Sequence, residues 1–466
     1  MEVREVSTIW YDSLMPSIVD YGVILIFLFI IFFAAMSHQN KNIDSNPAYK
    51  YFISGLFFKI FCGFGLCTVY TLYYGGGDTH AYFISSKAMV NVLLQKGPEP
   101  FFRLLLGDQS NQAYAFDSYT GLVFYWHDIQ AWTIIRFTSI FTIFSFKSYY
   151  TATLLLDVCA FVGVWKLYLT FTEIYPDYKN KLAIGILFVP SIVFWGSGIM
   201  KDTFTLSAAC WLTHNFYKIF IKKENIFSNI CLMIINIYII ISLKPYIIVA
   251  LLPGILIWIS FNYVKSVENK ILRTLFTPFL IVFGFGVGAI TLTAFSGSLG
   301  DYANIQSASK KAQITQQDLL RSDAYGANNY DLGSYEATPT GMIKKAPMAI
   351  LTVLFRPFLW EAKNPVMLIS GLENTIILLM TIFILFKVGV IKTFKIIGSE
   401  PFLFFSLLFA VIFSFSVGVA AANFGAMVRY RIPCMIFYIP TLIILYERMK
   451  SLKKDKETSR EQNRNK

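Results

Sequence analysis

The chain has few charged residues and lacks the motifs of soluble catalytic or metal-binding domains. Only 15% of its 466 residues are Asp, Glu, Lys or Arg, whereas 56% are hydrophobic; soluble domains carry about 25% charged residues. No GxxxxGKS/T, GxGxxG, HExxH or CxxC pattern occurs, so a nucleotide-driven or zinc-dependent site has no support. The six cysteines show neither metal nor redox spacing, which favours small buried side chains. A soluble enzyme, a disordered chain and a disulfide-stapled secreted domain are excluded.

The hydrophobic residues gather in apolar runs of about 17–25 residues, a length that crosses a bilayer. We therefore predict an all-α fold, a polytopic transmembrane bundle of about 11–13 spans with outer loops and short surface or re-entrant helices. Two shorter stretches, 131–146 and 346–360, are either short spans or re-entrant helices. The long runs lie near 17–36, 52–74, 149–172, 182–199, 202–221, 226–243, 245–264, 271–296, 366–391, 401–422 and 432–448.

The distribution of basic residues predicts the orientation. The tail 447–466 holds eight Lys or Arg against four acids, so we expect it to be cytoplasmic and disordered, after a membrane domain over 1–446. The net charge of +12 then reflects the positive-inside rule, and no nucleic acid partner is expected. The expected outer segments are 75–130, 196–202, 244–246, 297–365 and 423–433. On the count of eleven helices, the N-terminus also lies outside.

The first polar element on the expected outer face is Gly75-Gly76-Gly77-Asp78-Thr79-His80. The glycines end a spanning helix, and Asp78 with Thr79 is suited to cap a new helix over 81–95. Two interpretations stay open. Asp78 is either a plain helix cap or, beside His80, a carboxylate that acts as a general base on a hydroxyl group.

The second element is Lys201-Asp202, which follows Gly196-Ser197-Gly198 between two apolar runs. A charged pair so close to the bilayer is costly unless it faces protein or water, and it is a functional candidate for that reason. The alternative is a capping Asp with a Lys that snorkels to the membrane surface.

Four further cations lie at breaks between apolar runs, each near a proline and an aromatic residue. They are Lys244, Arg356, Arg429 and Arg431. Proline leaves backbone groups unpaired, which is tolerated at membrane depth only beside protein or a watery cavity. Converging cations suit a phosphate or diphosphate, although ordinary snorkelling remains the alternative for each one.

Acidic residues near these breaks complete the candidate set. Glu361 is assigned to substrate binding at the mouth of the site, and Glu373 is expected to be an intramembrane acid that pairs with a basic residue. The polar segment 297–345 contains a surface helix near 307–321 and a Tyr- and Asn-rich portion suited to sugars or to any wet loop. Asp157 and Lys166 are intramembrane charges without a functional interpretation.

The layout resembles the GT-C class of membrane glycosyltransferases. Gly77-Asp78-Thr79-His80 looks like the acidic element of the first outer loop in that class, and Pro190 to Asp202 looks like its second acidic element. The second half, with its outer loop and Arg429-Tyr430-Arg431, is similar to the O-antigen polymerase and ligase type. The chain departs from the GT-C pattern in having one extra early span and a single acid at 78.

Both resemblances imply an inner-membrane enzyme that transfers a sugar or oligosaccharide from a polyprenyl-linked donor to a glycan or lipid acceptor. Asp78 and Asp202 would be catalytic, and His80, Lys201, Lys244, Arg356, Glu361, Arg429 and Arg431 would bind substrate. No covalent intermediate is required, no cofactor is assigned, and a divalent cation positioned by Asp202 stays open. The alternatives are a repeat-unit polymerase, a lipid-linked oligosaccharide flippase or transporter, and a structural subunit without substrate.

Overall fold

The computed structural model describes residues 14–264, 305–320, 329–330, 332–333, 336 and 338–464. Over these ranges the regular elements are helices and no strand occurs, and an isolated antiparallel bridge joins Asn329 to Asn423. The all-α prediction is confirmed. The predicted run 271–296 and most of the Tyr- and Asn-rich portion after residue 320 lie outside the described residues.

Seven helices in the described part of the chain are long and apolar enough to cross a membrane. At a rise of about 1.5 Å per residue, their 18–27 residues match the hydrocarbon thickness of a bilayer. The chain is therefore a multi-pass membrane protein in a lipid bilayer. The helices are α2 (Ile18–Ile43), the continuous segment of η1 (Pro47–Tyr51), α3 (Phe52–Thr68) and η2 (Val69–Tyr73), and then α8 (Tyr149–Ile174), α12 (Ile226–Leu243), α19 (Pro365–Val388), α21 (Pro401–Ala420) and α23 (Ile432–Arg464).

Other predicted runs form shorter helices. The stretch expected to span near 182–199 divides into α9 (Lys179–Leu187) and α10 (Pro190–Trp195), since Pro190 interrupts the helix and Gly196 follows it. The next run forms α11 (Lys201–Phe216), continued by the π-helical η4 (Tyr217–Lys222). The stretches expected near 131–146 and 245–264 form α7 (Ile129–Phe144) and α13 (Tyr246–Val264). The stretch near 346–360 falls in α18 (Pro339–Phe355) and the break after it.

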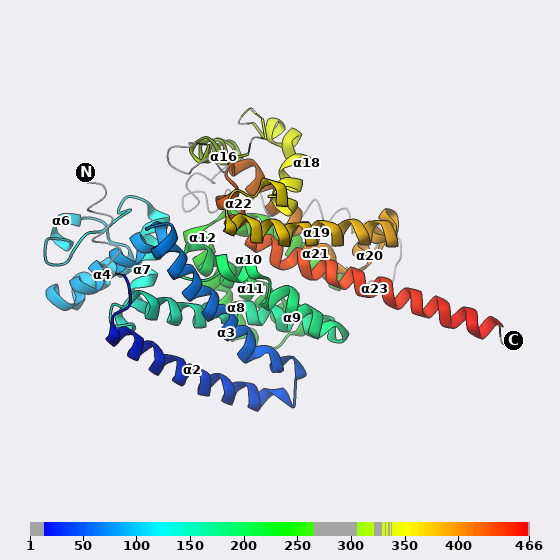
Figure 1. Ribbon diagram of the computed structural model, residues 1–466, viewed down its shortest axis with the longest axis horizontal. Helices are drawn as coiled ribbons and strands as arrows, with labels where there is room; N and C mark the ends of the chain where they lie inside the picture. The colour runs from blue at the N-terminus through cyan, green and yellow to red at the C-terminus, as the bar shows by residue number, and fades with distance from the viewer. Residues whose placement is uncertain are drawn as a thin grey trace. The chain divides into compact units, whose positions relative to one another are not determined.

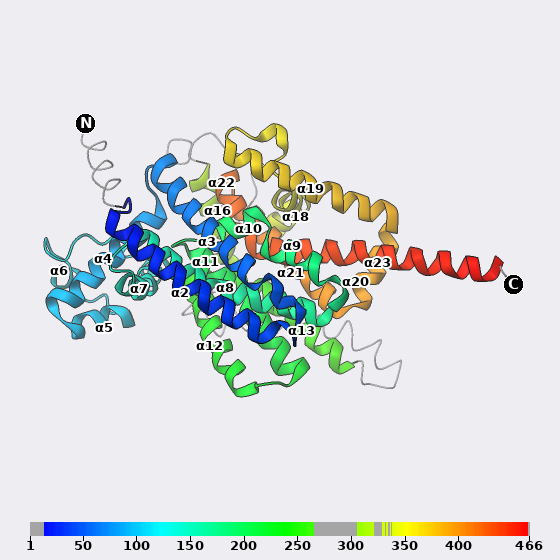
Figure 2. The ribbon, with the colours of Figure 1, turned by 60° about the horizontal axis from the view of Figure 1, so that its bottom comes forward.

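The chain divides into two compact units. Unit 1 comprises residues Met1–Leu169, Ile192–Leu212 and Met233–Lys244. Within it, α2 runs beside α3, and α4 (Asp78–Lys96) packs against α5 (Pro98–Leu106) and α7 (Figures 1 and 2). Phe83, Trp126, Trp132 and Tyr149 belong to one buried cluster that joins α4, α7, α8 and the segment between α5 and α7. This cluster fixes the loop that carries part of the candidate site.

Unit 2 comprises residues Thr170–Ser191, Thr213–Leu232 and Pro245–Lys466. Helix α21 packs against α13, α18 and α23, and α19 lies beside α23 (Figures 1 and 2). Phenylalanines of α21 and α23 fill the core, with ring centroids of Phe409 and Phe437 5.1 Å apart. Helix α16 (Ile305–Leu319) confirms the surface helix expected near 307–321.

The tail after Tyr446 differs from its prediction. It was expected to be disordered, whereas α23 continues through it to Arg464. Its Glu, Lys, Arg and Gln residues favour helix, and oppositely charged residues recur three or four positions apart along it. Charge density alone was therefore the wrong criterion for disorder here.

The cysteines also differ in part from the expectation. Cys62, Cys67, Cys210 and Cys434 are buried, as expected, but Cys159 and Cys231 are exposed. All six are free thiols.

Candidate functional site

Asp202 forms a buried ion pair with Lys244. The Asp202 side chain is 1% exposed, and its Oδ1 atom lies 2.5 Å from Nζ of Lys244, which is 8% exposed. Asp202 stands in the first turn of α11, where the helix dipole favours a negative charge. Lys244 directly follows α12 and precedes Pro245, which ends that helix. The charge of Lys244 is thus already matched within the protein.

Lys201, the first residue of α11, lies in a different environment. Its Nζ is 3.8 Å from Oδ2 of Asp128 and 5.9 Å from the ring centroid of Tyr82, and its side chain is 17% exposed. Asp128 caps α7 by accepting a hydrogen bond from the backbone N–H of Ala131, and half of its side chain is exposed. The Lys201 ammonium therefore lies beside a partly exposed acid and an aromatic ring. Snorkelling alone does not explain its position.

Asp78 is the first residue of α4, and the N-cap is Gly77. The expected capping by Asp78 is wrong, because this helix start has no side-chain capping hydrogen bond and Gly77 has φ +136°. The glycine run allows this geometry: Gly75, Gly76 and Gly77 all have positive φ, which side chains other than hydrogen disfavour. The Asp78 carboxylate, half-buried, instead accepts a hydrogen bond from the Tyr125 hydroxyl at 3.3 Å.

Tyr125 is a site residue that the sequence analysis missed. It has φ +58°, uncommon for a residue other than glycine, and such conformations often mark functional sites. Its ring centroid is 5.7 Å from that of Tyr82, which in turn lies under Lys201. A continuous path of contacts therefore runs from Asp78 through Tyr125 and Tyr82 to Lys201. The only signal in the sequence was the aromatic-rich run Phe124-Tyr125-Trp126 beside Asp128.

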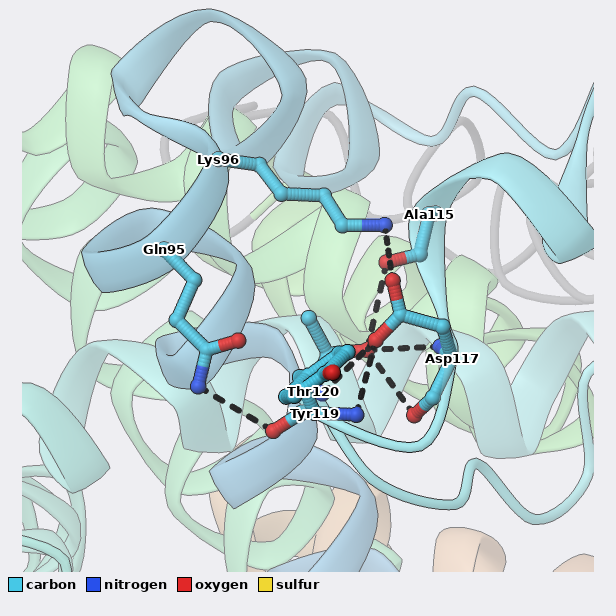
Figure 3. Close-up of polar contacts among 6 residues, drawn as sticks. All are labelled: Gln95, Lys96, Ala115, Asp117, Tyr119 and Thr120. Atoms are coloured by element: carbon cyan, nitrogen blue, oxygen red, sulfur yellow. Dashed lines mark hydrogen bonds and ion pairs between the residues drawn. The ribbon is translucent and has the colours of Figure 1, made fainter.

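The loop that carries Tyr125 and Asp128 is anchored on the end of α4 (Figure 3). Asp117 lies 2.7 Å from Nζ of Lys96 and accepts the backbone N–H groups of Tyr119 and Thr120 at 2.9 and 3.0 Å. The hydrogen bond from Lys96 and these backbone donors hold the pKa of Asp117 well below its usual range. Gln95 adds a bond from its side-chain amide to the carbonyl of Tyr119 at 3.1 Å.

His80 lies inside the protein. Its side chain is buried, its Nε2 is 3.1 Å from Oγ1 of Thr71, and its ring contacts that of Tyr149 edge-on. Burial lowers the pKa of His80 to about 4, so the ring is neutral at physiological pH. These contacts give His80 a structural role in joining α4 to η2 and α8, in place of the expected contact with substrate.

In unit 2, Arg356 is surrounded by one acid and two aromatic rings. Its Nε donates to the two carboxylate oxygens of Glu361 at 3.0 and 3.1 Å. Its guanidinium carbon lies 5.1 Å from the ring centroid of Phe424 and 5.7 Å from that of Tyr330. Burial raises the pKa of Glu361, but the hydrogen bonds from Arg356 and from the Phe358 N–H lower it more, so the net shift is downward. Glu361 therefore orients the arginine.

Arg431 is fully buried and satisfies backbone carbonyls. Its Nη1 donates to the carbonyls of Val353 and Arg356 at 2.8 and 3.0 Å, and its Nη2 donates to Asn374. These carbonyls lie in the last turn and at the C-cap of α18, where carbonyl groups have no N–H partner within the helix. Arg429, at the end of α22 (Phe424–Tyr430), is half-buried with its guanidinium 5.3 Å from the ring of Tyr430.

Glu373 makes hydrogen bonds to Ser191 in addition to the expected electrostatic interaction with a basic residue, which is Arg431. Its carboxylate accepts the backbone N–H of Ser191 at 3.1 Å and the hydroxyl of the same serine. It thereby caps the start of α10 within unit 2.

The predicted residues therefore fall into two groups. Unit 1 unites Asp78, Lys201, Asp202 and Lys244 in what we call the Asp78–Lys201 cluster, completed by Tyr82, Tyr125 and Asp128. Unit 2 brings together Arg356, Glu361 and Arg431. Among the described residues, no group of three or more His, Cys, Asp or Glu side chains is placed to hold a metal ion.

Comparison of the chain with protein-family models, curated proteins and solved structures found no significant match. The fold and the helix hydropathy define the class of the protein as a multi-pass α-helical membrane protein. Its activity has to be inferred from the two groups of side chains.

Proposed function

We propose that the chain is an inner-membrane enzyme of surface-glycan assembly, which transfers a sugar or oligosaccharide from a polyprenyl phosphate or diphosphate. The observation that carries this proposal is the path of contacts from Asp78 through Tyr125 and Tyr82 to Lys201. It supplies a carboxylate for general-base work, a cation for phosphate and two aromatic rings on which a sugar can stack.

The proposed step uses the cluster as follows. Asp78 removes the proton from a hydroxyl group of the glycan or lipid acceptor. The acceptor oxygen forms a bond to the anomeric carbon of the donor sugar while the bond from that carbon to the phosphate oxygen breaks. The electron pair of the broken bond leaves with the lipid phosphate, and Lys201 offsets the charge that develops there.

The neighbouring residues support this division of roles. The Tyr125 hydroxyl orients the Asp78 carboxylate by hydrogen bonding to Oδ1. Lys244 is assigned to Asp202 rather than to phosphate, because their pair is buried and close. Asp202 then fixes the start of α11 and the direction of Lys201, the residue before it.

Arg356 is a second candidate anion-binding residue, within unit 2. Arg356 keeps part of its side chain exposed, at 24%, and its guanidinium is held in one orientation by Glu361. A planar guanidinium that is held in this way suits bidentate contact with phosphate oxygens. Arg431 supports Arg356 from beneath by holding its carbonyl.

The test compares two carboxylates of the same polar segment. Asp78→Asn removes the base, and Asp108→Asn is the matched control, because Asp108 accepts the nearby Ser110 N–H in its own turn and is not part of the Asp78–Lys201 cluster. In source cells that lack the native copy, Asp78→Asn should abolish the surface glycan, whereas Asp108→Asn should restore it. Immunoblots of membranes check that both variants reach the level of the unmodified protein. Normal glycan with Asp78→Asn would contradict the proposal.

Transport is the competing outcome. A flippase would move a labelled polyprenyl-linked sugar across proteoliposomes without altering its glycosidic bond. Detection of such movement by the Asp78→Asn variant, at the rate of the unmodified protein, would replace the enzyme proposal by a transport function.

A further inference from the structure

A buried ion pair lies between two of the spanning helices of unit 1. Lys59 of α3 is 4% exposed and Asp157 of α8 is fully buried, and Nζ of Lys59 is 3.8 Å from Oδ1 of Asp157. Charges inside membrane-spanning segments are costly, and a buried pair is weak evidence for a gain in stability. The pair therefore needs an explanation other than helix packing.

Both members of the pair bind the same short turn, residues 196–198. The Lys59 ammonium donates to the carbonyl of Gly196 and to Oγ of Ser197, the latter at 3.3 Å. The backbone N–H of Gly198 donates to Oδ1 of Asp157 at 3.0 Å. The turn is thus held at its first residue by the cation and at its last residue by the anion.

The turn itself requires such partners. It joins the end of α10 at Trp195 to the start of α11 at Lys201, so its backbone groups lie outside regular helix. Non-helical backbone within a membrane protein has to be satisfied by protein or by a watery cavity. Gly198 has φ +73°, and a Cβ atom there would meet Cδ2 of Leu66 in α3 at 2.7 Å. The turn therefore packs tightly against the helix that carries Lys59.

Gly63 of α3 leaves space for the Asp157 carboxylate of α8. A Cβ atom on Gly63, one turn after Lys59 in α3, would lie 1.8 Å from Oδ2 of Asp157. The absence of a side chain at Gly63 lets Asp157 reach across from α8. Ser197 completes the contact: its Oγ donates to the carbonyl of Val193 at 2.6 Å and accepts from the Lys59 ammonium at 3.3 Å.

We infer that Lys59 and Asp157 are positioning residues, which together fix the turn 196–198 and so the direction in which α11 presents Lys201 and Asp202. Helix α11 begins at Lys201, three residues after the turn. A change in the turn therefore changes the direction of the Lys201 side chain within the Asp78–Lys201 cluster. What Lys201 binds rests on the proposed function, whereas the control of the turn by the ion pair does not.

The experiment uses full-length protein in lipid nanodiscs. The main variant is the double substitution Lys59→Met with Asp157→Leu, since an apolar pair of similar volume leaves no uncompensated charge and often preserves stability. The matched control is Lys166→Met, which removes a charge from the same helix α8 away from the turn. Hydrogen–deuterium exchange of the peptide over 195–203 reports on the turn, and the Kd for undecaprenyl phosphate reports on Lys201.

We expect the double variant to melt slightly below the unmodified protein and its turn to exchange faster, because the carbonyl of Gly196 and the N–H of Gly198 lose their partners. Its Kd for undecaprenyl phosphate should rise about tenfold, which corresponds to about 1.4 kcal/mol, the scale of one well-made hydrogen bond. Lys166→Met should match the unmodified protein in both measurements. A pair that stabilises the fold without placing Lys201 predicts an unchanged Kd for the folded double variant.

Three results decide against parts of this account. Unchanged exchange over 195–203 in the double variant would overturn the control of the turn. Faster exchange with an unchanged Kd would overturn the positioning of Lys201. If the unmodified protein does not bind undecaprenyl phosphate, the proposed function fails, and exchange at residues 201 and 202 alone decides the positioning.

A milder variant guards against failure of the double variant to fold. Ser197→Ala keeps the ion pair but removes the contact of Oγ with the Lys59 ammonium, together with the bond from Oγ to the carbonyl of Val193. It should increase exchange of the turn by a smaller factor, about threefold, since one weak hydrogen-bonding group is lost. No increase would contradict the inference.

Discussion

Lys244→Met and Lys201→Met should impair different properties, although each change removes one lysine near Asp202. The first should reduce stability, and the second should reduce affinity for the lipid phosphate. In the Lys244→Met variant, Asp202, whose side chain is 1% exposed, loses the ammonium that lies 2.5 Å from its Oδ1 atom. Removing one partner of a buried pair costs about 3–5 kcal/mol of unfolding free energy. Lys244→Met should therefore be strongly destabilising.

The Lys201→Met variant lacks this penalty. Its neighbour Asp128 lies 3.8 Å away and is 49% exposed, so water hydrates that carboxylate once Lys201 is gone. Exposed pairs of this kind contribute about 0–1 kcal/mol. The variant should keep nearly full stability but lose affinity for undecaprenyl phosphate, because Lys201 is the proposed phosphate contact in the Asp78–Lys201 cluster.

The assay measures the unfolding free energy in mixed micelles and the Kd for undecaprenyl phosphate on the same preparations. The double variant Lys244→Met with Asp202→Leu is the control, since removal of both charges should recover most of the lost stability. Equal stability losses for Lys244→Met and Lys201→Met would refute the assignment. So would a double variant no more stable than Lys244→Met, because the loss would then come from packing.

Two further predictions concern the surroundings of Asp78. The folded pKa of Asp117 is lowered, so the stability that Asp117 contributes to the loop is complete above the unfolded pKa of about 3.9 and is lost as the pH falls through the folded pKa. A spin label at residue 118, with the exposed native cysteines replaced, should become mobile only in that acidic range. If the label is as immobile in Asp117→Asn as in the unmodified protein at neutral pH, the anchoring is contradicted. Gly77→Ala should cost about 1–3 kcal/mol and reduce glycan transfer, since Gly77 has φ +136° and a Cβ atom there would meet Tyr70 at 2.9 Å. Gly22→Ala is its control, because Gly22 lies in α2 without a positive φ and no atom lies within 4 Å of a Cβ at that position, and equal transfer by the two variants would refute the strain argument.

Hydropathy alone was sufficient for most of the helical fold. The runs near 17–36, 149–172 and 366–391 became α2, α8 and α19, because a long apolar segment in lipid has to satisfy its own backbone groups. Helix breaks were harder to place. The segment 182–221 was expected to form two long spans, yet Pro190 and the turn 196–198 divide it into three shorter helices and the π-helical η4. Their positions depend on partners in other helices, which a hydropathy window does not include.

The candidate site was predictable where a charge stood out against its local sequence. Asp78, Lys201 and Asp202 were identified because they interrupt apolar runs beside glycines. Tyr125 was missed, since an aromatic residue in a polar loop has no periodicity and its role arises from a positive φ. Lys59 was missed for a different reason. It is a single lysine within an apolar run, and its partners Asp157 and Gly196 are distant in the sequence.

The cations on the expected outer face are not equivalent, although sequence position treats them alike. Lys244 and Arg431 have almost no exposed surface, and their donors are committed to Asp202 and to the carbonyls of Val353 and Arg356. A phosphate would have to displace these partners and leave a buried carboxylate or carbonyls unsatisfied, a loss that one new contact does not offset. Lys201 differs, because its ion-pair partner Asp128 is half exposed. Of the two predicted cations Lys201 and Lys244, Lys201 is therefore the better candidate for the proposed phosphate contact, and Lys244 holds the start of α11 through Asp202.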